Sequence, residues 1–270
     1  MRAWRGWLIG LGLWAPLLWA DELRIQECLI EPSASVELGA SGEGLLEAVL
    51  VDRGDRVTQG QVVARLTADL EAVTLRIAET RAANRAAIES GRSRVAYFGA
   101  QRRRSAQLRE RQLVAAEGLE RSRTEEALAN AELRLAELEY ELAQLERERA
   151  DILLAQRQVT SPFDGVVLVR HMHPGEYVNE QSVLMTLVAM DRLHVEAFLP
   201  LTHFPGIRPG MTLMVETRPP FAGRHEAEVE TVDRVFDAAS GTFGVRLVLD
   251  NQDRQLPAGI RCVLLIPEQV

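Results

Sequence analysis

The chain has 270 residues, of which 47% are hydrophobic and 26% charged, so it can bury the core of one or two folded domains. Its formal net charge of −8 argues against nucleic-acid binding, because contacts to phosphates require a basic surface. All 31 basic residues are arginine, and a chain without lysine cannot carry a group on a lysine side chain.

Residues 1–20 have the pattern of a secretory signal peptide. Two arginines precede an apolar run over residues 7–20, and two acidic residues follow it. The run is shorter than the roughly 20 residues that span a bilayer, so we predict export with cleavage after Ala20. An uncleaved inner-membrane anchor is the alternative, because Leu18 is large for the third position before a cleavage site.

An internal repeat links two segments, residues 36–67 and 159–188. Both alternate apolar and polar residues and carry glycines, which predicts short strands and tight turns. They align without a gap at a constant offset of 121 positions (165 minus 44), so that Gly44 matches Gly165. We expect two half-motifs that pack as one unit.

The segment between the two repeats, residues 68–158, predicts long helix because it lacks proline and is rich in Ala, Glu, Arg and Leu. Residues 68–112 hold ten Arg against five acids, and residues 119–158 hold six Arg against ten acids. Opposite charges favour two antiparallel arms of roughly 65 Å each, at 1.5 Å per residue. We place the turn near residues 112–118, because Gly118 favours a chain reversal.

A heptad pattern predicts how the two arms hold together. The second arm carries apolar residues at alternating steps of three and four, and the first arm follows a looser version. The residues expected in this seam are Leu70, Val73, Ile77, Ile88, Val95 and Phe98 in the first arm, and Leu128, Ala131, Leu135, Leu138, Leu142, Leu145 and Ile152 in the second.

The two cysteines lie in strand-like stretches at opposite ends of the chain. Residues 189–267 are β-patterned throughout, and Cys262 lies in the last apolar run, whereas Cys28 lies in a short run near the start. In an exported protein an even pair of cysteines is a candidate disulfide, and two free buried thiols are the alternative.

Three stretches of sequence, in order along the chain, carry a resemblance to a known family. Residues 54–61 are similar to the motif Gly-Asp-x-Val-x-x-Gly-Gln, and residues 161–167 to Ala-Pro-Phe-Asp-Gly-x-Val. Residues 240–246 resemble closing strands of a β-barrel domain. Together they resemble the membrane-fusion, or periplasmic adaptor, family of HlyD-like and RND-type efflux adaptors.

The resemblance implies an α+β fold with three parts. A lipoyl-like β-sandwich is split by a long antiparallel α-helical coiled-coil hairpin, and a C-terminal β-barrel domain follows. The implied bounds are 36–67 and 159–188 for the two halves of the sandwich, 68–158 for the hairpin, 189–270 for the barrel, and 21–35 for an N-terminal strand segment that joins the barrel.

The resemblance also implies a mechanical, non-enzymatic function in the periplasm. Such an adaptor links an inner-membrane transporter, with the RND class favoured over the ABC class, to a TolC-type outer-membrane channel. It assembles into a ring, expected to be hexameric, and needs no cofactor, no metal and no nucleic acid. The transported substrate cannot be inferred from the sequence.

Channel docking is expected at the hairpin tip. Family members that dock onto TolC-type channels share a pattern of Arg, Leu, Ser, Leu and Asp at fixed spacing. The same spacing here gives Arg104, Leu108, Ala115, Leu119 and Glu120, so Ala replaces the Ser and Glu replaces the Asp. The change from Ser to Ala at position 115 removes a hydroxyl that could form a hydrogen bond.

Other functions compete with the adaptor. An acyl or biotin carrier would modify a lysine at the turn between the two halves, and this chain has none. The run of residues 171–173, His-Met-His, could suggest a copper site, but we expect it to be a loop between strands. A periplasmic coiled-coil scaffold without a role in transport stays open.

Overall fold

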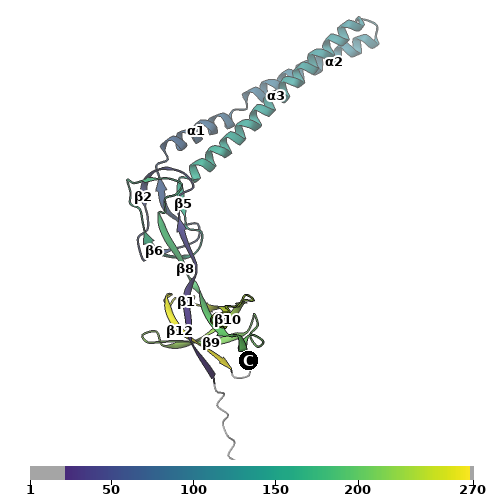
Figure 1. Cartoon of the computed structure of the whole chain (residues 1–270). Coiled ribbons are helices and arrows are strands. Elements are labelled where there is room, and N and C mark those ends of the chain that lie inside the picture. The colour runs from purple at the N-terminus through teal and green to yellow at the C-terminus, as the bar shows by residue number, and fades with distance from the viewer. Residues whose placement is uncertain (1–21, 268–270) are drawn as a thin grey trace, which may run out of the picture. The chain divides into compact units, whose positions relative to one another are not determined.

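The computed structural model describes the backbone of residues 22–267 and the side chains of residues 28–266. The chain divides into two compact units (Figure 1). We call residues 36–187 the central unit, and the parts up to residue 35 and from residue 188 the terminal unit. The predicted signal segment and the cleavage site after Ala20 lie outside the described residues.

The terminal unit is a sheet in which the first strand pairs with the last. Its strand order is β1-β12-β9-β10-β11-β8, and β1 also pairs with β8, so the order returns to its starting strand. The bounds are β1 Glu22–Leu38, β8 Met185–Pro200, β9 Thr212–Thr217, β10 Gly223–Val232, β11 Thr242–Asp250 and β12 Ile260–Pro267. One turn of 3-10 helix, η1 Leu201–His203, follows β8.

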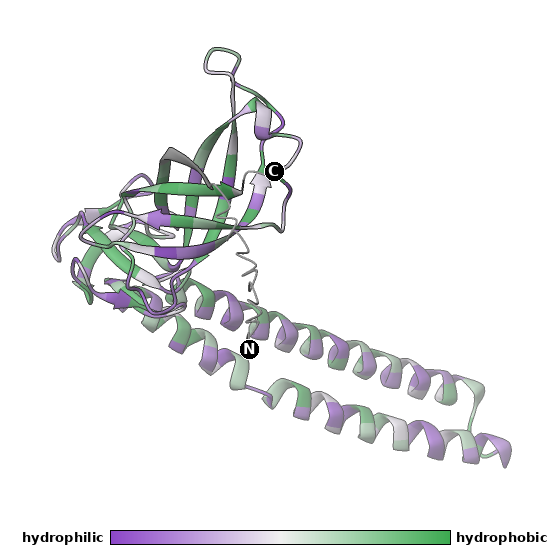
Figure 2. Ribbon diagram, turned by 90° about the horizontal axis from the view of Figure 1, so that it is seen from below, coloured by the Kyte–Doolittle hydropathy of each residue, from purple (hydrophilic) through white to green (hydrophobic). Residues whose placement is uncertain are grey.

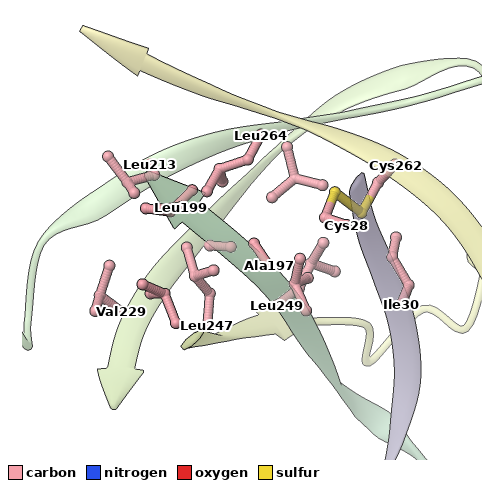
Figure 3. Packing of buried hydrophobic residues seen from close by; sticks show 14 of the residues in the cluster. Cys28, Ile30, Ala197, Leu199, Leu213, Val229, Leu247, Leu249, Cys262 and Leu264 are labelled. Carbon is pink, nitrogen blue, oxygen red and sulfur yellow. A yellow bond between two sulfur atoms is a disulfide. The ribbon is translucent and has the colours of Figure 1, made fainter. Parts of the chain in front are cut away.

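Alternation along these strands builds the core of the terminal unit. In β11 the side chains of Phe243, Val245, Leu247 and Leu249 are all buried, at steps of two residues. Because successive side chains of a strand point to opposite faces, one face of β11 lies in the core and the other outside it. Figure 3 shows Leu247 and Leu249 packed together with buried side chains of other strands.

A disulfide closes one side of this core. Cys28 of β1 lies opposite Cys262 of β12 in the strand pairing, and the two sulfurs are bonded (Figure 3). Their Cα atoms are 4.9 Å apart, within the range that a disulfide can bridge. Both cysteines are buried, so the bond also packs as part of the apolar cluster.

Strand pairing in the central unit confirms the internal repeat. β2 Gly44–Val49 pairs with β7 Tyr177–Val178, and β3 Arg56–Val57 pairs with β6 Gly165–Arg170. In the first pair Gly44 lies opposite Val178, and in the second Gly165 lies opposite Val57. The offset of 121 positions turns Gly44 into Gly165 and Val57 into Val178, so the two pairings are the same pairing repeated. The two halves therefore pair symmetrically, as a repeat without a gap predicts.

The two halves share one apolar core. Two further strands, β4 Val62–Leu66 and β5 Gln158–Thr160, pair with each other beside β2. Leu46 and Val63 from the first half and Val167 and Leu184 from the second are buried in one cluster.

The repeat-matched glycines do not all lie at turns. The matched pair Gly54 and Gly175 both have positive φ angles, 90° and 93°, which explains why glycine stands at these turns. Gly165, for which the sequence also suggested a turn, is instead the buried first residue of β6.

Three helices follow β4, and two of them pack against the third. They are α1 Asp69–Ala83, α2 Ala86–Glu110 and α3 Ala116–Ala155. The first predicted arm is thus two helices, interrupted at Asn84 and Arg85. The Asn84 Oδ1 accepts a hydrogen bond from the Ala86 N–H at 3.0 Å, and the Arg85 guanidinium lies over the Tyr140 ring at 5.2 Å.

Ion pairs between the arms confirm their antiparallel direction. Arg81 pairs with Glu146 at 3.5 Å, Arg94 pairs with Glu132 at 2.7 Å, and Arg102 pairs with Glu126. The partner's number falls as the arginine's number rises, as two opposed helices require. Opposite charges on the two arms therefore meet as the sequence indicated.

The predicted seam joins the arms only in part. In the first arm Ile88 is buried and Val95 and Phe98 are partly buried, whereas Leu70, Val73 and Ile77 are exposed. The buried residues of the helices are mostly small: Ala78, Ala82, Ile88, Gly91, Gly99, Ser122, Ala129 and Ala150. The predicted seam residues of α3 are instead half exposed or more, apart from the partly buried Ala131. Small side chains let the helices approach closely, and this contact displaces the leucines to another face. Green and purple residues accordingly alternate along the helices in Figure 2.

Candidate docking site

The turn between α2 and α3 is a Schellman motif. Gln112 adopts a left-handed conformation with φ 61°, two residues after the end of α2. The Leu113 N–H donates to the Leu108 carbonyl at 2.9 Å, and the Gln112 N–H donates to the Arg109 carbonyl at 2.9 Å. These two bonds satisfy carbonyls that the helix end would otherwise leave free, and they turn the chain sharply.

Gly118 is not the reversal residue that the sequence suggested. It lies in the first turn of α3, and a Cβ at this position would come within 2.8 Å of the Val114 side chain. A side chain at position 118 would therefore have to displace the Val114 side chain, whereas Gln112 supplies the reversal.

The predicted tip residues lie on both sides of this turn. Arg104 and Leu108 lie in the last two turns of α2, Ala115 caps α3, and Leu119 and Glu120 lie near its start. All are exposed except Leu119, which is half buried. The Glu120 carboxylate pairs with Arg123 at 2.6 Å.

Leu113 is a tip residue that the sequence pattern missed. Its side chain is 69% exposed, more than that of Leu108 at 40%. An apolar residue in a turn with charged neighbours is a sign of a contact surface. Position 113 is not one of the five positions of the family pattern, so the pattern did not select it. The tip thus presents two exposed leucines with charged side chains around them.

The His-Met-His run has ordinary structural partners. The His171 Nε2 lies 2.9 Å from the Thr186 hydroxyl, and the His173 Nδ1 lies 3.4 Å from the Glu176 carboxylate. Within the described part of the chain, no group of three His, Cys, Asp or Glu side chains could hold one metal ion. No helix of the described residues is long and apolar enough to cross a membrane.

Two charged side chains of the terminal unit have shifted pKa values. A hydrogen bond from the Ala239 N–H and another from the Ser240 hydroxyl lower the pKa of Asp237. A hydrogen bond to Glu196 at 2.5 Å, helped by the charge of that carboxylate, raises the pKa of Arg246. Each interaction stabilises the charged form, so both groups act as fixed charges rather than as acids or bases.

Comparison with known proteins agrees with this architecture. The family described as "CzcB-like, barrel-sandwich hybrid domain" matches residues 35–189, more than half of the chain. The Nodulation protein NolF of Rhizobium meliloti (strain 1021) is 32% identical over 114 residues, which is 41% of this chain. That match spans 30% of the length of NolF.

Solved structures share the fold over most of the chain. MacA from Actinobacillus actinomycetemcomitans aligns with a TM-score of 0.75 and 18% identity, over 92% of this chain and 79% of that one. The membrane fusion protein Spr0693 from Streptococcus pneumoniae R6 aligns with a TM-score of 0.58 and 15% identity, over 92% and 98%. The chain therefore belongs to the membrane-fusion, or periplasmic adaptor, family of efflux systems and contains a barrel-sandwich hybrid domain.

Proposed function

We propose that this chain is the periplasmic adaptor of a tripartite efflux or secretion system, linking an inner-membrane transporter to a TolC-type outer-membrane channel. The observation that carries the proposal is the exposed turn between α2 and α3, where Arg104, Leu108 and Leu119 keep the spacing of the family's docking pattern at the end of a helical hairpin. α3 alone has 40 residues and is about 60 Å long at 1.5 Å per residue. That length is suited to reaching a distant partner.

The parts of the chain take different roles in this proposal. Residues 36–67 and 159–188 form the lipoyl-like domain, residues 68–158 form the hairpin, and residues 21–35 and 189–270 form a β-barrel domain. Copies pack side by side into a hexameric ring, whose transporter partner is of the RND class. The signal peptide is cleaved after Ala20, and the mature protein works in the periplasm.

The tip is suited to docking because it combines apolar and charged side chains on an exposed turn. Leu108 and Leu113 supply apolar surface, and Arg104 supplies an exposed charge with five hydrogen-bond donors. Interfaces of this mixed type gain affinity from a few apolar anchors and gain orientation from charged groups around them.

An export assay with tip variants tests the proposal. Arg104→Glu combined with Leu108→Gln should abolish export, because both side chains are exposed and would meet the channel directly. The melting temperature should stay unchanged. Arg103→Glu is the matched control, since it reverses the charge of an exposed neighbour on a different face of α2 and should export normally.

Two results would contradict docking at the tip. Normal export by the Arg104 and Leu108 double variant would remove the tip from the mechanism. Early melting of that variant would show that these side chains stabilise the hairpin instead. Co-purification of the wild-type chain with an inner-membrane transporter separates an adaptor from a scaffold without a role in transport.

A further inference from the structure

One end of the terminal unit carries apolar side chains that its core leaves uncovered. Val235 and Phe236 lie in the loop between β10 and β11, and Leu201 begins η1. Val235 is 88% exposed, more than any other large hydrophobic side chain of the described residues, and Phe236 and Leu201 are 43% and 38% exposed. The Leu201 N–H donates to the Gly241 carbonyl at the end of that loop, so the two segments are neighbours. We call Leu201, Val235 and Phe236 the apolar end; apolar side chains exposed together are typical of a contact surface.

The loop of the apolar end has a defined conformation. The Phe236 ring lies edge-to-face against Phe204 with ring centroids 4.8 Å apart, and Phe204 packs in the same way against the buried Phe243 at 5.2 Å. The Asp237 carboxylate accepts two hydrogen bonds of 2.9 Å from the same loop. The fold therefore holds these apolar side chains in solvent, since the loop is anchored on both sides of Val235.

Strand register places the apolar end at the end of the sheet where β1 starts. Glu22 of β1 lies opposite Pro267 of β12, and Leu265 of β12 lies opposite Met214 of β9. The start of β1 and the end of β12 therefore lie together, where β9 begins (Figure 1). Because β9, β10, β11 and β8 are antiparallel neighbours, the same end of the sheet holds the end of β10, the start of β11 and the end of β8. The apolar end lies in the connections at these points.

The apolar run of residues 7–20 brings this end of the sheet to a membrane. That run enters the bilayer in both interpretations of the sequence, as a signal peptide during export or as a retained anchor. Only Asp21 separates Ala20 from β1. Two residue steps of at most about 3.6 Å keep Glu22 within about 7 Å of the run. While the run is attached, the start of β1 therefore lies at the membrane surface.

Charges around the apolar end permit contact with lipid. Residues 201–211 and 233–241 contain two arginines, Arg208 and Arg234, and two aspartates, so their formal charges cancel, whereas the whole chain has a net charge of −8. Arg234 is exposed directly before Val235 and forms no ion pair within the described part of the chain. An arginine can lay its apolar stem along the membrane surface while its guanidinium binds headgroup phosphates.

We infer that the apolar end inserts into the surface of the membrane that residues 7–20 enter, with Val235 and Phe236 among the acyl chains and Arg234 at the headgroup phosphates. Lipid is the partner because the chain's own membrane segment meets the bilayer at this end of the sheet. The inference goes beyond the proposed function, since the contact needs neither a transporter nor a channel. After cleavage it keeps the mature chain at the membrane.

A single tryptophan tests the contact directly. The mature chain that starts at Asp21 has no tryptophan, so Val235→Trp gives it one reporter at the apolar end. An N-terminal histidine tag on nickel-chelating lipid holds this chain on vesicles of phosphatidylethanolamine and phosphatidylglycerol, as residues 1–20 would. The emission should shift to shorter wavelength, and acyl-chain bromination of the lipids should quench it about threefold or more, because an inserted side chain lies at the acyl boundary.

Phe221→Trp is the matched control. Phe221 is 41% exposed in the loop between β9 and β10, at the opposite end of the sheet, so its tag-bound variant should keep its emission. Equal quenching of the two variants, or quenching of neither, would overturn the inference. Unchanged melting temperatures would show that both variants fold.

A second measurement separates lipid from protein as the partner. Val235→Asp should leave co-purification with an inner-membrane transporter unchanged, because the side chain contacts lipid. If Val235→Asp loses the transporter and Val235→Trp is not quenched on vesicles, the apolar end binds protein and the inference is wrong. If the wild-type chain never binds a transporter but Val235→Trp is quenched, the lipid contact stands and the adaptor function fails.

Discussion

Asn251 shows how one buried polar side chain can hold a turn in the terminal unit. Its Nδ2 donates to the Met190 carbonyl at 2.8 Å and to the Leu256 carbonyl at 3.0 Å, and its Oδ1 accepts from the Leu256 N–H at 3.0 Å. The side chain is almost fully buried, and these bonds use both ends of its amide. The turn after β11 is thus held by hydrogen bonds of the Asn251 side chain, because the backbone pairing of β11 with its neighbours ends there.

Asn251→Ala should destabilise the protein more than its size suggests. The change leaves a buried N–H and two carbonyls without this partner, which should lower the free energy of unfolding by about 3 kcal/mol. Chemical denaturation measures the loss. Asp253→Ala is the control, because that side chain is exposed in the same turn. Equal stability of the two variants would contradict the role assigned to Asn251.

Two glycines at the helix contact differ in what lies opposite them. A Cβ on Gly91 would lie 3.1 Å from the Leu133 Cδ1 and 3.3 Å from the Leu133 Cα, which belongs to the backbone of α3. A Cβ on Gly99 would lie 3.1 Å from the Glu126 Oε1, the end of a flexible side chain. The Leu133 Cα cannot move without shifting α3, whereas the Glu126 carboxylate can move by rotation of its side chain.

Alanine at these two positions should therefore act in opposite directions. Gly91→Ala should lower stability by about 1–3 kcal/mol through overpacking, which outweighs its better helix propensity. Gly99→Ala should raise stability by up to about 1 kcal/mol, because alanine favours helix and Glu126 can yield. Thermal melting of both variants gives the comparison. A stabilised Gly91→Ala would show that the arms are less closely packed.

The helices also show what a heptad pattern can and cannot predict. Steps of three and four along α3 correctly indicate a helix, but they do not identify the surface that covers its leucines. The contact between the arms uses Ala129, Ala150 and Gly91, and small residues give a weak hydrophobic signal. Asn84 interrupts the apolar pattern of the first arm at the position of the helix break, whereas the contact of Arg85 with the Tyr140 ring leaves no periodic trace in the sequence.

At the scale of the whole molecule, the repeat and the charge balance carried the most information. A constant offset predicted that the halves on either side of the helices pair, and the equivalent registers of Gly44 and Gly165 confirm it. Opposite net charges predicted antiparallel arms. The turn lies where the sequence predicted it, near residue 112, but the reversal is made by Gln112, in a conformation that glycine usually supplies, and not by Gly118.

Tryptophan fluorescence tests the predicted cleavage. All four tryptophans lie within residues 1–20, so mature protein that starts near Asp21 has none. Purified periplasmic material should show emission from tyrosine only, and intact mass should match the shortened chain. Emission from tryptophan would mean that the segment is retained and would favour the anchor.

The pairing of β1 with β12 has a consequence for the order in which the chain can fold. As a chain emerges N-terminus first, the central unit is complete once residue 187 has appeared, but β1 must wait for β12. At about 5–20 residues per second, the remaining 80 or so residues take roughly 4–16 seconds. During this delay β1 has an unpaired edge and Cys28 a free thiol. Because the chain has two cysteines, Cys28 cannot form a wrong bond within its own chain, and its hazard is a bond to a neighbouring nascent copy.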